Sequence, residues 1–306
     1  MQHKHQAAST ASRPELYQEI TDKIVHQIEA GTIPWVQPWA GGPMLSLPVN
    51  ASTDKTYSGV NILLLWDALF AHGYDTNRWL TFKQALALGG AVRKGEHGTT
   101  VVYADRFTPK SENGSEPSAD ETPRRVPFLK RYTVFNVSQC EGLPDELTMA
   151  LPAVSFRLPI DSAEALIAAS GAEFRRGGHH AFYHTQGDYI SVPEQDRFFE
   201  PVNFYRTALH ELTHWSGAKH RLNRDFTGRF GSEAYAREEL VAEIGSAFLC
   251  ASLGIVPTVR HADYIANWLA VLKNDARTIV SAASHASKAS DFLLAFLPTD
   301  LASRAA

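Results

Sequence analysis

Two histidines four residues apart, His210 and His214, constrain this chain more than any other feature of its sequence. On a helix, residues with this spacing lie one turn apart on the same face, so both imidazoles can bind a single ion. Apolar residues recur at helical spacing around them, Pro201 precedes them and Gly217 follows, which predicts a helix with a defined start and end. With Glu211 between the histidines, the pattern is typical of zinc-dependent hydrolases; two solvated histidines on a surface helix are the alternative.

A zinc site of this kind needs a third protein ligand, and two candidates lie downstream. The first is His220, which has the spacing of the metzincin motif, with Gly217 turning the chain. That class also requires a methionine turn below the metal. The three methionines, however, all lie upstream, at Met1, Met44 and Met149. The metzincin interpretation therefore fails a necessary condition.

The second candidate lies in a helix predicted over residues 235–249. Glu239 and Glu243 are one turn apart there, among apolar residues, where carboxylates without partners are costly. One can bind zinc while the other orients a histidine ligand through its second ring nitrogen. Alternatively, both carboxylates face solvent and pair with basic residues such as Arg237. We predict that Glu239 is the third ligand and that Glu243 orients a histidine ligand. His220 and Glu243 remain the alternatives to Glu239 as the third ligand.

Composition sets the broad class of protein. The chain has 306 residues, 44% of them hydrophobic, and a formal net charge of −4 at pH 7. These values are ordinary for one large or two ordinary globular domains, and they give no basic excess that would point to nucleic acid. Two distant cysteines, Cys140 and Cys250, fit a reducing compartment. No signal peptide is recognisable and no apolar run approaches the roughly 20 residues of a membrane span, so we expect a cytoplasmic protein without a membrane partner.

The first half of the chain brings aromatic and basic residues close together. Two tryptophans follow prolines, which favour an extended path, and basic residues lie near Trp79, Phe82 and Tyr103. Rings can stack on unpaired bases while cations meet phosphates, an arrangement suited to single-stranded DNA. Alternatively, the tryptophans anchor the core and the charges are ordinary solvated surface. The candidate DNA contacts are Trp35, Trp39, Trp79, Lys83, Arg93 and Lys94.

Hydrophobic periodicity and turn residues predict the remaining elements. Helices are expected over residues 15–30 and 59–66, from an N-cap at Thr81 to Gly89, and over 162–170 and 264–289. Strands are expected at the end of the segment 92–103 and over 131–137, 181–184 and 188–192. The last two strands form a hairpin that can bind an extended peptide by strand addition. The nearby His179, His180 and His184 are possible ligands, with solvated loop residues the alternative.

The chain divides into two domains in an α+β fold. Residues 1–13 are polar and are predicted to be a disordered tail. Residues 14–145 form an α+β domain, interrupted at 108–125 by a charged, Pro/Gly/Ser-rich stretch that is predicted to be a flexible insertion. A boundary falls near 142–150, and residues 151–306 form a mostly helical domain with a small antiparallel sheet.

In their order along the chain, these motifs resemble those of ArdC-type antirestriction proteins. The matching segments are 33–39, 57–61, 79–85 and 92–95 in the first half and 210–215, 221–224 and 235–243 in the second. The resemblance covers residues from about 17 to 293, with no counterpart for the insertion at 108–125. It implies a single-stranded-DNA-binding domain followed by a zincin-type peptidase domain, and a protein that protects incoming plasmid or phage DNA from restriction.

The histidine motif and the resemblance to ArdC-type proteins together predict a zinc metallopeptidase whose protein substrate is unknown. Zinc, or another divalent metal, would be held by His210, His214 and Glu239, with a fourth position left for water. Glu211 would take a proton from that water as it attacks a peptide carbonyl. The candidates for a further donor to the developing oxyanion are Tyr183, Tyr235 and His220.

Two other functions remain as alternatives. In the first, the protein only coats single-stranded DNA, and its metal site is structural or inactive. Structural zinc sites are normally closed by four protein ligands, often including cysteine, and neither cysteine lies near the motif. In the second, the protein is a nuclease or phosphoesterase, but metal sites of those enzymes are usually richer in carboxylates.

Overall fold

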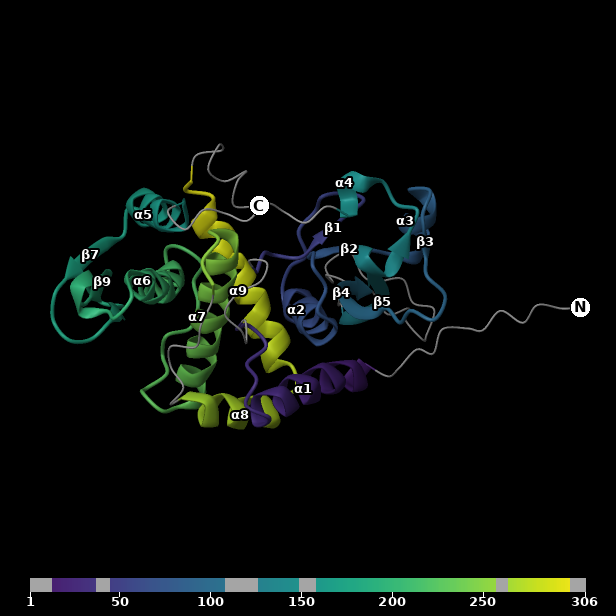
Figure 1. Cartoon of the computed structure of the whole chain (residues 1–306). Coiled ribbons are helices and arrows are strands. Elements are labelled where there is room, and N and C mark those ends of the chain that lie inside the picture. Colours follow the sequence, from purple (N-terminus) through teal and green to yellow (C-terminus); the bar gives the residue numbers. More distant parts are fainter. Residues whose placement is uncertain (1–12, 37–44, 108–125, 149–157, 257–263, 298–306) are drawn as a thin grey trace, which may run out of the picture.

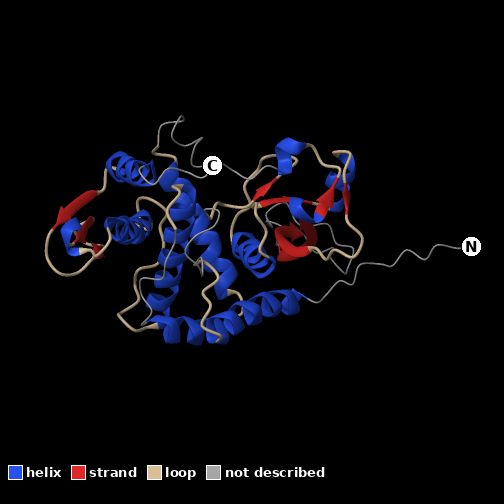
Figure 2. Cartoon of the chain, in the orientation of Figure 1, coloured by secondary structure: helices blue, strands red, loops and turns tan. Residues whose placement is uncertain are grey.

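The computed structural model describes residues 13–36, 45–107, 126–148, 158–256 and 264–297 (Figure 1). Residues 1–12 of the predicted tail, the predicted insertion at 108–125 and residues 149–150 of the predicted boundary lie outside these ranges. Within them the chain forms two parts of mixed helix and strand, and the sheets lie at opposite ends with long helices between them (Figure 2). No helix in the described ranges combines the length and apolar character needed to cross a bilayer.

The first part begins with two helices that cover a sheet. The predicted helix at 15–30 is α1 (Arg13–Glu29), followed by Gly31 at a φ of 80°. The predicted helix at 59–66 is α2 (Val60–His72), which continues for six residues beyond the apolar run. It ends at Gly73, whose left-handed backbone conformation suits glycine because no Cβ clashes there.

The sheet of the first part has four strands in the order β1-β2-β5-β4. Its strands are β1 (Val49–Asn50), β2 (Arg78–Leu80), β4 (Thr99–Phe107) and β5 (Val126–Asn136). Only β1 and β2 are parallel. The smaller elements are α3 (Phe82–Ala87), β3 (Ala91–Val92), η1 (Val137–Gln139), β6 (Cys140–Glu141) and α4 (Asp145–Thr148). Thr81 caps α3 as predicted, in a capping box with Gln84.

Two of the tryptophans that were predicted to contact DNA lie in the core. Trp35 is 1% exposed and packs edge-on against Trp268, with ring centroids 5.8 Å apart. Trp79 is fully buried, and its indole nitrogen donates a hydrogen bond of 2.8 Å to Asn77. The prediction that these two rings stack on bases is therefore wrong, because a base cannot reach a ring that is already enclosed. Trp39 lies outside the described residues.

In its described residues, the second part combines a small sheet with five α-helices. Its elements are α5 (Leu158–Ser170), β7 (Glu173–Arg176), β8 (Phe182–His184), β9 (Tyr189–Val192), η2 (Gln195–Arg197), α6 (Pro201–Ser216), α7 (Glu233–Ser252), α8 (Ile265–Asn274) and α9 (Thr278–Leu294). β8 and β9 form the predicted antiparallel hairpin, while β7 pairs with β9 in parallel, so the sheet is mixed. The prediction of a small antiparallel sheet is thus right for the hairpin, but it did not include the parallel strand β7.

The helical run predicted over 264–289 is interrupted. It forms α8 and α9, separated by residues 275–277, of which Asp275 has an extended backbone. The carboxylate of Asp275 accepts a hydrogen bond of 2.9 Å from the backbone N–H of Arg277. Aspartate side chains bound in this way compete with helical backbone hydrogen bonds, which explains the break that apolar periodicity does not reveal.

One buried cluster joins the two parts of the molecule. Its members from α1 and α2 include Leu16, Ile20, Ile24, Leu63 and Trp66, and its members from α7, α8 and α9 include Leu240, Ile244, Phe248, Trp268 and Ile279. At its centre the rings of Trp66 and Phe248 meet edge to face at 5.6 Å. A second cluster packs α5, α6 and β9 against the other side of α7 and α9. The two clusters hold α7 from both sides and so fix its position (Figure 1).

Candidate metal centre

The two histidines of the motif lie on α6, which packs side by side with α7. α6 starts with Pro201 in its first turn, and every residue from 204 to 216 is buried. The His210 and His214 rings are 4.9 Å apart and nearly perpendicular, at 80°. Because both side chains are almost inaccessible to water, the alternative of two solvated surface histidines is excluded.

Glu239 of α7 completes a group of three possible ligands. One carboxylate oxygen lies 3.5 Å from Nε2 of His210, and the other lies 3.5 Å from Nε2 of His214. Within the described part of the chain, these three are the group whose ligand atoms all lie within 4.8 Å of one another. Tetrahedral bonds of about 2.1 Å place neighbouring ligand atoms about 3.4 Å apart, so this spacing fits a divalent metal ion.

Two further carboxylates face the remaining nitrogens of the histidines. Glu238 lies 3.0 Å from Nδ1 of His214, and Glu243 lies 3.8 Å from Nδ1 of His210. Carboxylates in this position fix the ring orientation and leave Nε2 directed to the metal. The sequence indicated Glu243 for this role but not Glu238. The one sequence signal for Glu238 is that it is another carboxylate in an apolar helix.

Arg224 anchors Glu238 from the loop after α6. Its guanidinium donates to both oxygens of Glu238, at 2.9 and 3.0 Å, and to Ser216 and the carbonyl of Thr213. Burial alone would raise the pKa of Glu238, but hydrogen bonds from His214 and Arg224 hold that pKa below its usual range. Arg224 therefore keeps the supporting carboxylate ionised and ties the loop to the end of α6.

The carboxylates make the centre strongly negative. Burial disfavours the charged form of His214, but hydrogen bonds to Glu238 and Glu239 raise its pKa to about 10. Burial likewise opposes ionisation of Glu239, yet hydrogen bonds from His210 and His214 lower the pKa of that carboxyl. Such surroundings stabilise a cation, whether it is a proton on the imidazole or a divalent ion in its place.

Replacing Glu238 with glutamine is expected to weaken metal binding by about 10–100-fold, the usual effect of losing a carboxylate behind a histidine ligand. Competition with a chromophoric chelator measures this affinity. The matched control is Glu233→Gln, in the first turn of the same helix, where the side chain is 60% exposed. Equal affinities in the two variants, with intact circular dichroism, would show that Glu238 does not support the ligand.

The other histidines considered from the sequence lie elsewhere. His220 is 65% exposed and has Nε2 at 3.4 Å from Asp188, on the side of the β8–β9 hairpin. His184 stacks on Tyr189 at 4.8 Å, and both His179 and His180 are exposed in the loop before β8. None of these four belongs to the group of three ligands.

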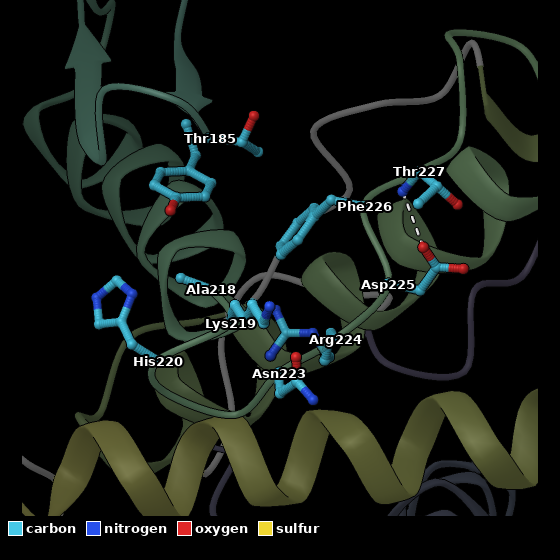
Figure 3. Close-up of a pocket in the computed structure, with 10 residues that line it drawn as sticks. Thr185, Ala218, Lys219, His220, Asn223, Arg224, Asp225, Phe226 and Thr227 are labelled. Atoms are coloured by element: carbon cyan, nitrogen blue, oxygen red, sulfur yellow. Dashed lines mark hydrogen bonds between the residues drawn. The ribbon is translucent and has the colours of Figure 1, made fainter.

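A cavity of about 610 Å³ opens near the loop after α6 (Figure 3). It is bounded by β8 and the turn that follows it on one side and by the loop after α6 on the other. The Phe226 ring in its wall is 6.4 Å from the His214 ring. None of the three candidate ligands lines the cavity, whose walls come from segments that the sequence motif does not include.

The basic residues predicted to contact DNA lie on the surface of the first part. Lys83 of α3 and Lys94 are exposed, whereas Arg93 donates 2.8 Å and 2.6 Å hydrogen bonds to Glu96 and to the carbonyl of Ser138. Among the described residues of this part, the large exposed rings do not belong to tryptophans. They are Phe82, Tyr103 and Tyr132, which are 51%, 60% and 42% exposed.

Two family models match the chain. One, described as the N-terminal domain of anti-restriction factor ArdC, matches residues 14–135. The other, described as a zincin-like metallopeptidase, matches residues 161–285 and so contains the three candidate ligands. The predicted likeness to ArdC-type proteins is thereby confirmed, as is the presence of a zincin-like domain.

Similar proteins cover the chain at moderate identity. Protein y4eC of Sinorhizobium fredii is 41% identical over 285 residues, 91% of each chain. Two DNA primases TraC of Escherichia coli are 39% and 37% identical over 92% of this chain, which spans only 27% and 20% of their length. The metal-free crystal structure of the antirestriction ArdC protein from plasmid R388 superposes with a TM-score of 0.78 at 40% identity, and its Mn(II)-bound structure with 0.74 at 39%. Each superposition covers 92% of this chain and 97% of that protein, and the bound manganese indicates a divalent metal in this fold.

Proposed function

The chain belongs to the ArdC family of antirestriction proteins, and from this premise we propose that it protects incoming plasmid or phage DNA from host restriction in the cytoplasm. The first domain, residues 14–145, would bind single-stranded DNA. The second, residues 151–306, would cleave a protein with a zinc-dependent site. The convergence of two histidine nitrogens on one carboxylate, 3.5 Å from each, carries the peptidase proposal.

The make-up of the centre favours catalysis over a structural role. Three protein ligands leave a coordination position for water or substrate, whereas structural zinc sites are usually closed by four. Both cysteines, Cys140 and Cys250, are buried and lie outside the group of ligands. The nitrogen-rich donor set also suits zinc better than magnesium or calcium, which weighs against a carboxylate-rich nuclease centre.

Glu211 is proposed as the general base. When bound, zinc supplies a Lewis acid that activates water and polarises a peptide carbonyl. Glu211 would accept a proton from the attacking water and pass it to the leaving amine. It is buried in α6 and directly follows the proposed ligand His210 in the sequence.

Tyr235 is the favoured donor to the oxyanion among the three side chains considered. The hydroxyl of Tyr183 donates to Asp188 at 2.8 Å, and His220 pairs with the same carboxylate. Both are therefore engaged away from the centre. Burial and hydrogen bonds with Tyr264 and Glu239 raise the pKa of Tyr235, so its hydroxyl stays protonated, and the bond to Glu239 places it next to the proposed ligand.

Because Trp35 and Trp79 are buried, the aromatic residues proposed to stack on DNA bases are now the exposed Tyr103 and Tyr132. Tyr103 of β4 pairs with Lys130 of β5, and Tyr132 lies two residues further along β5. Both rings consequently point to the same face of the sheet, as diagonal neighbours. The ammonium of Lys130 lies 5.7 Å from the Tyr132 ring. Two exposed rings with a cation between them suit stacked bases and a phosphate, and the exposed Lys83 and Lys94 remain proposed contacts.

Replacing Tyr103 with alanine is expected to weaken binding of a single-stranded oligonucleotide by about 5–150-fold, because each stacked base contributes about 1–3 kcal/mol. Fluorescence anisotropy with a labelled oligonucleotide measures the change. The control is Phe199→Ala, a ring fully exposed in the other part of the molecule. An unchanged affinity for both Tyr103→Ala and Tyr132→Ala would rule out this face as the DNA site.

Protection of unmodified incoming DNA tests the function as a whole. Wild type, Glu211→Gln and Tyr103→Ala are compared in the same restricting host. Our proposal requires protection to fall in both variants, because each removes one activity. Full protection by Glu211→Gln would leave DNA binding as the whole function and make peptidase action dispensable.

A further inference from the structure

We propose that Tyr264, the N-cap residue of α8, is a positioning residue for peptide cleavage, because it holds the hydroxyl of Tyr235 in place to donate to the developing oxyanion. The two hydroxyl oxygens lie 3.1 Å apart, in a hydrogen bond in which either group can be the donor. This inference rests on the proposed peptidase function. It adds to the reaction a residue that lies outside the histidine motif and outside α7.

The hydroxyl of Tyr235 lies at the edge of the metal centre. Tyr235 precedes Glu239 by four residues on α7, and residues with this spacing share one face of a helix. Its hydroxyl is hydrogen-bonded to the Glu239 carboxylate. The oxygens of that carboxylate are in turn 3.5 Å from the Nε2 atoms of both histidines. A group that fixes the Tyr235 hydroxyl therefore acts on the centre without contacting a ligand itself.

Three aromatic rings hold the two hydroxyls together. The rings of Tyr235 and Tyr264 have centroids 5.9 Å apart. Phe230, from the loop before α7, contacts both of them, with centroids at 5.3 Å from Tyr235 and 6.4 Å from Tyr264. Tilted and edge-on contacts at these distances are favourable between aromatic rings. The cluster therefore keeps both phenols in the orientation that their hydrogen bond requires.

The first part of the molecule holds α8, and with it Tyr264. The Tyr264 ring packs against the buried cluster that joins the two parts. Four residues further along α8, Trp268 meets Trp35 from the segment after α1, with ring centroids 5.8 Å apart. Near the end of α8, which runs beside α1 (Figure 1), Lys273 forms an ion pair of 2.5 Å with Glu29. The first part therefore contributes to the placement of the Tyr264 hydroxyl.

The bond between the two tyrosines matters most when an oxyanion is present. A tyrosine hydroxyl has a single proton to donate. When Tyr235 donates that proton to an oxyanion, its oxygen can only accept, so Tyr264 becomes the donor within the pair. Hydrogen bonds in series polarise one another, and the bond from Tyr264 therefore strengthens the donation by Tyr235. An interaction that is stronger in the transition state than with bound substrate raises kcat and leaves KM unchanged.

Tyr264→Phe tests this role, because it removes the hydroxyl and keeps the ring. For a peptide that the zinc-loaded full chain cleaves, we expect kcat to fall about 3–10-fold, as for the loss of one hydrogen bond, with KM unchanged. Tyr235→Phe should lower kcat about 10²–10³-fold, the usual effect of removing one oxyanion donor. The matched control is Tyr205→Phe, which removes a hydroxyl that donates to the Glu164 carboxylate at 2.9 Å and should leave cleavage unchanged.

The double variant separates positioning from general support of the fold. If Tyr264 acts through Tyr235, adding Tyr264→Phe to Tyr235→Phe should lower kcat no further, because the hydroxyl that it positions is already absent. Zinc affinity, measured by competition with a chelator, should be the same in Tyr264→Phe and wild type. An equal loss of kcat from Tyr264→Phe in both backgrounds would overturn the inference, as would a wild-type kcat in the single variant.

A phosphinic analogue of the same peptide gives a readout without turnover, because its tetrahedral phosphinate resembles the oxyanion. By calorimetry with the zinc-loaded full chain, it should bind about 3–10-fold more weakly to Tyr264→Phe than to wild type or Tyr205→Phe. Equal affinity for Tyr264→Phe and wild type would overturn the inference while the zinc centre stands. If wild type neither cleaves a peptide nor binds a phosphinic peptide, the proposed function fails, and the inference with it.

Discussion

Glu211→Gln is expected to lower kcat/KM for peptide cleavage by roughly 10²–10⁴-fold, the usual contribution of a positioned general base. Glutamine keeps the size and shape of the side chain but cannot accept the proton. The metal should stay bound, because the proposed ligands are His210, His214 and Glu239, whose nitrogen and oxygen atoms face one another across the centre. Single-turnover cleavage of a peptide mixture, followed by mass spectrometry, measures the loss.

The control for this experiment separates chemistry from folding. Zinc content per chain and thermal unfolding should match those of wild type, and Glu233→Gln at the exposed start of α7 should cleave normally. Cleavage by Glu211→Gln at the wild-type rate would remove Glu211 from the proposed role. A loss of zinc in the same variant would instead mean that Glu211 belongs to the binding of the metal.

Phe248→Ala is expected to lower the free energy of unfolding by about 3–5 kcal/mol, as found for buried phenylalanines. The ring is fully buried and meets Trp66 of α2 edge to face at 5.6 Å. Against a total stability of about 5–15 kcal/mol, such a loss leaves a much larger unfolded fraction. Urea unfolding followed by fluorescence measures the change.

The position of Phe248 makes this prediction informative about the centre as well. The residue lies on α7, the helix that also carries Glu239, and it packs in the cluster that joins the two parts of the molecule. The exposed Phe199→Ala should change stability by no more than about 0.5 kcal/mol. A change below about 1 kcal/mol for Phe248→Ala would show that the two parts do not depend on this shared core.

The metal centre was largely predictable because its pattern is local. Residues four apart on a helix share a face whatever the rest of the chain does, so His210 and His214 could be paired from spacing alone. Glu239 could be nominated because an ionised side chain in an apolar helix requires a partner. The supporting role of Glu238 could not be predicted from the sequence. It depends on Arg224, fourteen residues away, and on how α6 packs against α7.

The tryptophans show the opposite case. The proline-rich segment around Trp35 is compatible with an exposed ring and with a buried one, and only contact with Trp268 on α8 decides between them. The same holds for Trp79, whose neighbours in the core come from α2 and from β4 and β5. Composition near a ring does not report its burial, because burial is set by residues distant in sequence.

By itself the sequence determined the helices that carry the histidines and the acidic residues, the capping of α3 by Thr81 and the likeness to ArdC-type proteins. These depend on spacings within a few residues or on the order of short motifs. The tertiary structure decided which carboxylate lies between the two imidazoles, that His220 pairs with Asp188 instead, and that Arg224 supports Glu238. Each of these requires segments brought together by burial of apolar surface, which has no local signature in the chain.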